Sequence, residues 1–399
     1  MAGMLEGLDS IDWARLGHAY GTADDVPGQL RALASDDAGL RGKALYDLYG
    51  NIFHQGTRYE ATAYAVPFLL ELLGNPAAPN RADILGLLTS IAIGYDEQWL
   101  PFPLPIAAHR EESAGGAELV AQSHDYAPDD LEEDEEVEEY AFLEELSDED
   151  QNRYFAYIAV AAYDAVKAGV AFLRTLLSDP DLAVATRAAY ALAWFPEEAA
   201  DSIPVLSAAT ASDPVLSATS VAALGLLGSD ISEAFLTDAQ PLTRWGAAVA
   251  LAQTHRDTTP PLAVTELLHW TASPDAADER IPFLNGDLSG YAAMAAVQTG
   301  PANADAAFAA MLARFGSMSG TASLPVTAAA LQLAFPNGAI APGTPFSALD
   351  SRQRQFTSRL AECPNAWLYN GSTFGNFSMM MSAYSLPNSR EAMQSFTTT

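Results

Sequence analysis

The densest group of side chains able to do chemistry lies in the ten residues from Asn51 to Glu60, NIFHQGTRYE. Each polar side chain there offers donors or acceptors that a loop on a rigid scaffold could aim at a ligand. We take as candidate binding residues His54, Gln55, Arg58, Tyr59 and Glu60. An inter-helix turn explains the same residues if His54 caps a carbonyl and Arg58 pairs with Glu60 or Asp47.

The sequence gives little support for catalysis or metal binding. The group lacks a second histidine and an evident nucleophile nearby. The six histidines show no HxxxH or HExxH spacing, and the lone Cys363 has no CxxC partner. His109 and His124 could meet carboxylates only through the fold. We therefore predict no catalytic residues, no metal and no cofactor, and we favour a protein that is not an enzyme.

A phrase that occurs three times between Ser178 and Gln253 predicts the scaffold for these residues. The copies are SDPDLAVATRAAYALAWF, SDPVLSATSVAALGLLG and TDAQPLTRWGAAVALAQ, which begin at Ser178, Ser212 and Thr237. Each opens with Ser/Thr-Asp and continues into small residues that let neighbouring helices approach closely. A helical unit that recurs every roughly 25–45 residues is the signature of an α-solenoid.

The same copies predict where three helices begin. Asp179, Asp213 and Asp238 can accept hydrogen bonds from the unpaired amides of a first helical turn. Pro180 and Pro214 fit at the first helical position, where no backbone donor is needed.

Helical patterns extend on both sides of the repeats, and no alternating strand pattern of any length is visible. We predict an all-α chain, an α-solenoid of helix pairs with an acidic, irregular insertion. N-terminal helical repeats span residues 1–94, a proline-rich and acidic insertion spans 95–147, further repeats span 148–345, and a C-terminal helix and cap span 346–399. In the insertion, Pro101, Pro103 and Pro105 interrupt helical structure, and AHREESAGGAE from Ala108 is typical of a loop.

The formal net charge is −32, from 51 acidic and 19 basic residues. Only two of the basic residues are lysines, so a GC-rich genome explains much of this imbalance. The exception is Asp125 to Asp150, where 15 of 26 residues are acidic and none is basic. Such a block resists burial and is typical of a solvent-facing loop. Alternatively, with Tyr140, Phe142, Leu143 and Leu146, it forms an acidic amphipathic helix that docks on a cationic partner.

Further candidate binding residues lie in this insertion. Glu135 and Glu136 lie in the acidic block, and Trp99 flanks the proline run. Exposed aromatic and charged residues around a rigid groove are the residue types expected at binding hot spots.

The repeated phrase resembles HEAT repeats, including the short form found in bacterial proteins and in phycobiliprotein lyases. Arg187 and Arg244 stand at the arginine position of the HEAT phrase, Arg41 is a further match, and Ser220 replaces the arginine in one copy. The segment LYGNIFHQGTRYEATAYAVPFLLELL, from Leu48, resembles uncharacterised HEAT-repeat proteins of actinobacteria. The resemblance covers residues 147–334 and, loosely, the first 95. It implies binding of proteins, and sometimes of nucleic acid, through a concave face.

Composition excludes several classes of partner. A chain of charge −32 without a basic stripe is unsuited to phosphate backbones, so we predict no nucleic acid. No run of about 18 uncharged apolar residues is present, so we predict no membrane partner. One cysteine and no apolar leader favour the cytoplasm. The sequence leaves the oligomeric state open.

We therefore predict a non-catalytic protein-binding solenoid, acting as a scaffold, an adaptor or an inhibitor of the immunity type. Its acidic surface would engage a cationic protein or peptide, and complementary charge would speed that encounter. The alternative is an enzyme that acts on a small-molecule or peptide substrate in the solenoid groove around His54, Arg58 and Glu60.

Overall fold

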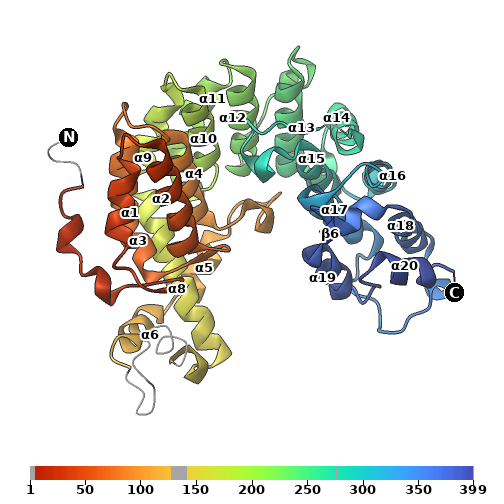
Figure 1. The fold of residues 1–399 in the computed structure, drawn as a ribbon. Helices are drawn as coiled ribbons and strands as arrows, with labels where there is room; N and C mark the ends of the chain where they lie inside the picture. Colours follow the sequence, from red (N-terminus) through yellow and green to blue (C-terminus); the bar gives the residue numbers. More distant parts are fainter. Residues whose placement is uncertain (1–4, 127–141, 275, 399) are drawn as a thin grey trace. The chain divides into compact units, whose positions relative to one another are not determined.

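Figure 1 shows the computed structural model, which describes residues 5–126, 142–274 and 276–398. Helices make up most of these residues, and the strands form three separate two-stranded hairpins. The predicted all-α fold, an α-solenoid of HEAT-like helix pairs, is confirmed. The chain forms two compact units: Met1–Gln98 with Leu104–Ala199, and Trp99–Pro103 with Ala200–Thr399. The four-part division made from the sequence stays a prediction.

Unit 1 is built around one long helix, α8 (Asp148–Lys167), which contacts α3, α4, α5 and α6. The other α-helices of unit 1 are α1 (Val26–Leu33), α2 (Ala38–Asn51), α3 (Glu60–Gly74), α4 (Arg81–Ile93), α5 (Ile106–Glu112), α6 (Gly116–Ser123), α9 (Val170–Thr175) and α10 (Leu182–Leu192). Its strands are β1 (Gly17–His18), β2 (Gly21–Thr22), β3 (Phe53–His54) and β4 (Thr57–Arg58), and its 3₁₀-helices are η1 (Leu8–Ser10), η2 (Trp13–Arg15), η3 (Asp96–Gln98), η4 (Leu176–Ser178) and η5 (Pro196–Glu198). The buried face of α8 forms much of the unit's core.

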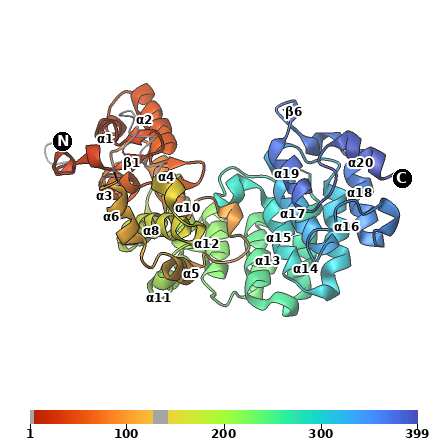
Figure 2. The same cartoon turned by 90° about the horizontal axis from the view of Figure 1, so that it is seen from below.

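Unit 2 is itself an array of helices (Figure 2). Its α-helices are α11 (Ala199–Ala209), α12 (Pro214–Leu226), α13 (Pro241–His255), α14 (Pro261–Ala272), α15 (Leu288–Val297), α16 (Ala304–Arg314), α17 (Ser323–Ala334), α18 (Ser351–Glu362), α19 (Gly375–Ala383) and α20 (Arg390–Phe396), and its strands are β5 (Leu368–Tyr369) and β6 (Ser372–Thr373). From α12 to α17, each helix packs against the next, and most also pack against the next but one. This pattern of contacts between neighbours is that of a repeat protein.

The three hairpins were not expected from the sequence, because strands of two residues are too short to show alternation. The two end residues of each hairpin have six residues between them. The carbonyl of Leu16 accepts a hydrogen bond from the N–H of Ala23, and that of Trp367 accepts one from Phe374. In the β3–β4 hairpin the Thr62 hydroxyl bridges the two ends instead. Gln55 and Gly56 form its turn with positive φ, at 50° and 92°.

The loop predicted around AHREESAGGAE is wrong, because α5 and α6 occupy this segment. Pro105 precedes the first turn of α5, where its missing N–H costs no hydrogen bond. Gly115 separates the two helices with a φ of 88°. A Cβ on Gly116 would lie 2.4 Å from the carbonyl oxygen of Arg153, so only glycine lets α6 lie this close to α8.

The predicted helix start is confirmed in the second copy of the repeated phrase and is wrong in the first and third copies. Asp213 caps α12, with Pro214 at the first helical position. By contrast, α10 is capped by Asp181, because Pro180 belongs to the preceding turn. The third helix begins at Pro241, three residues after Asp238, because the proline takes the first helical position.

Among the described residues, no single helix is both long enough and apolar enough to cross a membrane. Asp148–Lys167 and Val170–Ser178, which meet at 45°, reach that length and composition only as a bent pair.

Candidate functional site

The residues predicted to form one recognition site lie on and just after the β3–β4 hairpin, but they contact different neighbours. Nδ1 of His54 lies 3.4 Å from the hydroxyl of Tyr20 in the β1–β2 hairpin. Gln55 is an exposed turn residue. The N–H of Tyr59 donates to the Thr62 hydroxyl over 2.8 Å and so fixes the start of α3. The fold does not bring the predicted residues together in one site.

Arg58 has no carboxylate partner within the described parts of the chain. Its Nη1 donates to the Gly56 carbonyl over 2.7 Å, and its Nε is buried without a hydrogen-bond partner. Burial lowers the pKa of Arg58 to about 10, because desolvation disfavours the charged guanidinium. The expected pairing with Glu60 or Asp47 is wrong, since Asp47 pairs with a lysine and Glu60 with a histidine.

Glu60 faces a cavity of about 220 Å³ in unit 1. Arg15 and the β1–β2 hairpin line one side, and His124 and Tyr126, which follow α6, line another. The Tyr154 ring on α8 completes the lining. Four separate parts of the sequence therefore form this cavity, which we call the Glu60 cavity.

The contact between Glu60 and His124 is the main polar feature of the Glu60 cavity. Nε2 of His124 lies 2.8 Å from both carboxylate oxygens of Glu60. The Glu60 side chain is only 9% exposed, and that of His124 is 30% exposed. Because a carboxylate only accepts, the imidazole proton must lie on Nε2. Sequence reasoning missed this pair, because 64 residues separate its members and no local pattern links them.

The histidines form no metal site among the residues that the structure describes. Nδ1 of His109 lies 3.8 Å from Glu112, whereas His124 contacts Glu60. Within those residues, no group of three histidine, cysteine or carboxylate side chains is placed to hold a metal ion.

Glu135 and Glu136 lie outside the described residues, and Trp99 belongs to unit 2. The two ends of the acidic segment are nonetheless described. The rings of Tyr126 and Phe142 pack edge to face, with centroids 5.4 Å apart. Tyr126 and Phe142, which stand on either side of residues 127–141, are therefore in contact on unit 1, and Tyr126 also lines the Glu60 cavity.

The apolar residues after the acidic segment pack inside unit 1. Phe142 is buried against Tyr154 and Ile158, and Leu143 and Leu146 join the same cluster. The predicted docking helix is therefore wrong in this respect. Phe142, Leu143 and Leu146 anchor the chain to α8, whereas Tyr140 lies outside the described residues.

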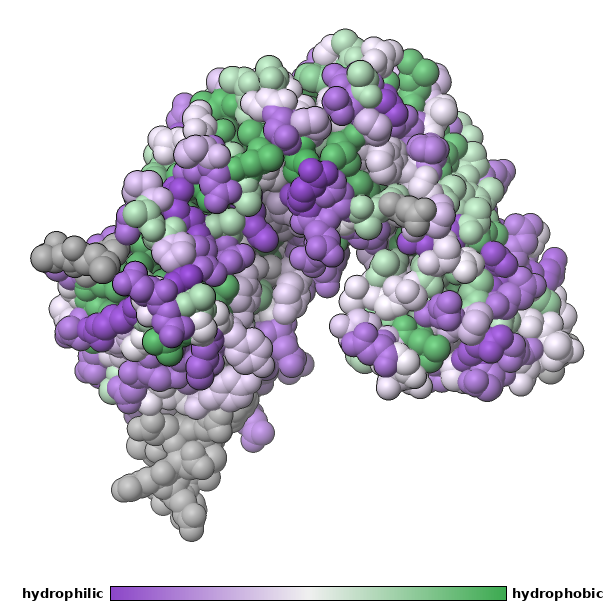
Figure 3. Space-filling model, turned by 45° about the horizontal axis from the view of Figure 1, so that its top comes forward, coloured by the Kyte–Doolittle hydropathy of each residue, from purple (hydrophilic) through white to green (hydrophobic). Residues whose placement is uncertain are grey.

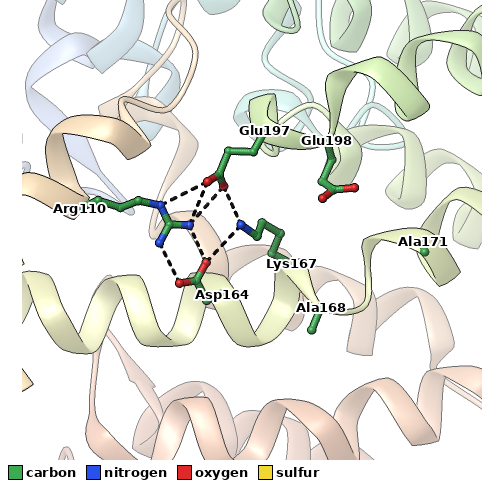
Figure 4. Close-up of a pocket in the computed structure, with 7 residues that line it drawn as sticks. All are labelled: Arg110, Asp164, Lys167, Ala168, Ala171, Glu197 and Glu198. Atoms are coloured by element: carbon green, nitrogen blue, oxygen red, sulfur yellow. Dashed lines mark hydrogen bonds and ion pairs between the residues drawn. The ribbon is translucent and has the colours of Figure 1, made fainter.

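A second cavity of unit 1, of about 510 Å³, holds a network of four charges (Figure 4). Arg110 of α5 donates to both oxygens of Asp164 on α8, at 2.8 and 2.6 Å, and to Glu197 of η5 at 3.1 Å. Nζ of Lys167 lies 3.2 Å from the same Glu197. Each charge has an opposite partner, so the network joins α5 to α8 and η5 and leaves no charge free for a ligand.

This network predicts a stability contribution that is lost in acid. Hydrogen bonding to Arg110 lowers the pKa of Asp164. Burial alone would raise the pKa of Glu197, but hydrogen bonds from Arg110 and Lys167 outweigh it and leave that pKa lowered. A lowered folded-state pKa stabilises the fold above the unfolded-state pKa of about 4, and the stabilisation disappears as pH falls through the folded-state value.

We expect Arg110→Met to lower the free energy of unfolding at pH 7 by about 1 kcal/mol or less, because the pairs are partly exposed. The difference from the unmodified protein should shrink below about pH 4. Urea unfolding at a series of pH values measures it, with Lys43→Met of the exposed Lys43–Asp47 pair as the control. A difference independent of pH would instead assign the loss to the packing of Arg110 over the Tyr163 ring.

Exposed tyrosines accompany the candidate residues of unit 1. Tyr20, Tyr46 and Tyr64 are 59%, 79% and 49% exposed, whereas Trp13 belongs to the core. On the face drawn in Figure 3, hydrophobic residues lie among hydrophilic ones. Unit 1 therefore presents both aromatic and charged side chains to solvent.

Residues 140–227 match the family model of HEAT repeats. The matched residues include α8 to α12. No curated protein and no solved structure matches the chain. This segment is therefore similar to HEAT repeats, which generally serve as scaffolds for protein interactions.

Proposed function

We propose that this chain is a non-catalytic protein-binding solenoid whose acidic surface engages a cationic protein or peptide. It would act as a scaffold, an adaptor or an inhibitor, and neutralisation of a basic toxin is one concrete case. The similarity of residues 140–227 to HEAT repeats supports a protein as the partner. The charge of the chain supports a cationic one.

The basic residues are largely used within the fold, which leaves the acidic surplus to the surface. At least eleven of the 19 basic residues pair with carboxylates in the described structure. Others, such as Arg41 and Arg354, donate to backbone carbonyls. The electrostatic field at the surface of the protein, which a partner would encounter, therefore comes mainly from unpaired carboxylates.

The charge of residues 127–141 carries the proposal. Nine of the 15 residues from 127 to 141 are acidic, and none is basic. Tyr126 and Phe142, the described residues on either side of this segment, pack against each other on unit 1. The nine carboxylates add to the negative charge of the chain and so to its attraction for a cationic partner.

The test begins by capturing the partner from native cells with the full chain. We expect a basic protein whose association rate falls steeply between low and high salt. Replacing Glu132, Glu135 and Glu136 by glutamine should slow association roughly tenfold at low salt. The matched control replaces Glu233, Glu279 and Glu391, exposed carboxylates of unit 2, and should change the rate little. An acidic partner, or an association rate independent of salt, would refute the proposal.

The enzymatic alternative gains no support from the described geometry. His54 and Arg58 do not line the Glu60 cavity, and each contacts a different neighbour.

A further inference from the structure

We propose that the Glu60 cavity receives one arginine side chain of the cationic partner. This inference rests on the proposed function and names the chemistry of one contact within it. The cavity volume of about 220 Å³ lies below the range of about 300–1,000 Å³ that is typical for drug-sized ligands. A single long side chain is an occupant of suitable size.

The charge of the cavity favours a cation beside Glu60. The carboxylate of Glu60 is almost covered by protein, and its one partner among the described residues is His124. A cation that displaces His124 would meet the negative charge of this carboxylate. A carboxylate removed from water in this way gains most from a cation that also hydrogen-bonds to it.

The direction of the carboxylate favours arginine over lysine. Both oxygens of Glu60 lie 2.8 Å from one atom, Nε2 of His124, so both face the same side. A guanidinium can donate two parallel hydrogen bonds to oxygens arranged in this way, whereas an ammonium group acts as a point charge. The arginine would replace His124 as the partner of Glu60.

The other lining residues suit an arginine that belongs to a peptide. The ring of Tyr126 offers an apolar surface for the aliphatic stem and a face for the cation. Arg15, the one arginine among the lining residues, is exposed. It can donate to a main-chain carbonyl of the bound peptide, because a guanidinium has only donors.

The test uses the full chain and three acetylated, amidated tripeptides, Gly-Arg-Gly, Gly-Lys-Gly and Gly-citrulline-Gly, with affinities measured by ligand-observed NMR. We expect the arginine peptide to bind most tightly and the uncharged citrulline peptide most weakly. Glu60→Gln should weaken binding of the arginine peptide roughly 10- to 100-fold, because a charge-assisted pair is lost. His124→Ala should strengthen binding of the arginine peptide several-fold, because His124 would no longer compete with the peptide for Glu60.

Two controls separate binding from folding. Glu111→Gln removes an exposed carboxylate of α5 outside the cavity and should leave the affinity unchanged. Glu60→Asp keeps the charge and should retain more affinity than Glu60→Gln, with circular dichroism showing that both variants fold. Equal affinities for the arginine and citrulline peptides, unchanged affinity in Glu60→Gln, or weaker binding in His124→Ala would overturn the inference.

The captured partner distinguishes the two proposals. If the glutamine substitutions at Glu132, Glu135 and Glu136 slow its association but Glu60→Gln leaves its affinity unchanged, the arginine contact is wrong and the proposed function stands. If neither set of substitutions has an effect and salt does not change the rate, the proposed function itself is wrong.

Discussion

Arg81→Met should lower the free energy of unfolding by about 3–5 kcal/mol, because it leaves a buried carboxylate without its cation. Nη1 of Arg81, at the start of α4, donates to Asp179 before α10 over 2.7 Å. The two side chains are only 9% and 8% exposed. Nε of Arg81 also donates to the Leu73 carbonyl, which the substitution would leave without this donor.

Arg58→Met is the matched comparison, because it removes a guanidinium without an acidic partner in the described structure. Burial lowers the pKa of Arg58, because removal from water destabilises the charged guanidinium. An apolar side chain of similar length should therefore leave the free energy of unfolding unchanged or raise it. Urea titration followed by circular dichroism measures both variants.

A double variant tests the cause assigned to Arg81. Adding Asp179→Leu to Arg81→Met removes the orphaned carboxylate and should recover most of the lost stability. Equal losses in the single and double variants would show that packing of Arg81, and not its charge, holds α4 to α10. A loss in Arg58→Met as large as that in Arg81→Met would contradict the distinction between paired and unpaired arginines.

Asp179 also shows which part of the fold could be predicted from the sequence. Its spacing and residue type correctly indicate a turn before a helix, since such signals act over a few residues. Its carboxylate, however, accepts from Arg81, 98 residues earlier, and the cap passes to Asp181. Local patterns determine that helices occur and roughly where they begin. The partner of a given side chain depends on packing between helices, which no local pattern records.

The candidate site, too, could be predicted from the sequence only in part. The ten residues from Asn51 to Glu60 are recognisable as a polar turn between helices, and Glu60 does line a cavity. Its partner His124 reaches it only because α6 lies against α8, a contact that depends on the absence of a Cβ at Gly116. The side chains of His54 and Arg58 do not line that cavity. Because these residues are close in the sequence, their position in one region of the structure was predictable. Which of them line the same cavity was not.

Gly246→Ala should lower the free energy of unfolding by about 1–3 kcal/mol, although alanine is the better helix former. Gly246 lies on α13, and a Cβ there would lie 2.6 Å from the carbonyl oxygen of Ala218 on α12. In the same interface, a Cβ on Gly225 would lie 2.6 Å from Cα of Ala250. These contacts are between backbones, which cannot move aside without separating the two helices. The small residues of the repeated phrase thus set the spacing of α12 and α13, as the sequence predicted.

Gly42→Ala is the matched control, because Gly42 lies within α2 and a Cβ there would meet nothing within 4 Å. It should raise the free energy of unfolding by about 0.5–1 kcal/mol through helix propensity alone. Gly246→Val should lose more than Gly246→Ala, since its two further methyl groups enter the same contact. Urea titration of the three variants gives the comparison. A gain in Gly246→Ala equal to that in Gly42→Ala would mean that α12 and α13 can move apart at little cost, and that close helix contact does not hold this pair of repeats together.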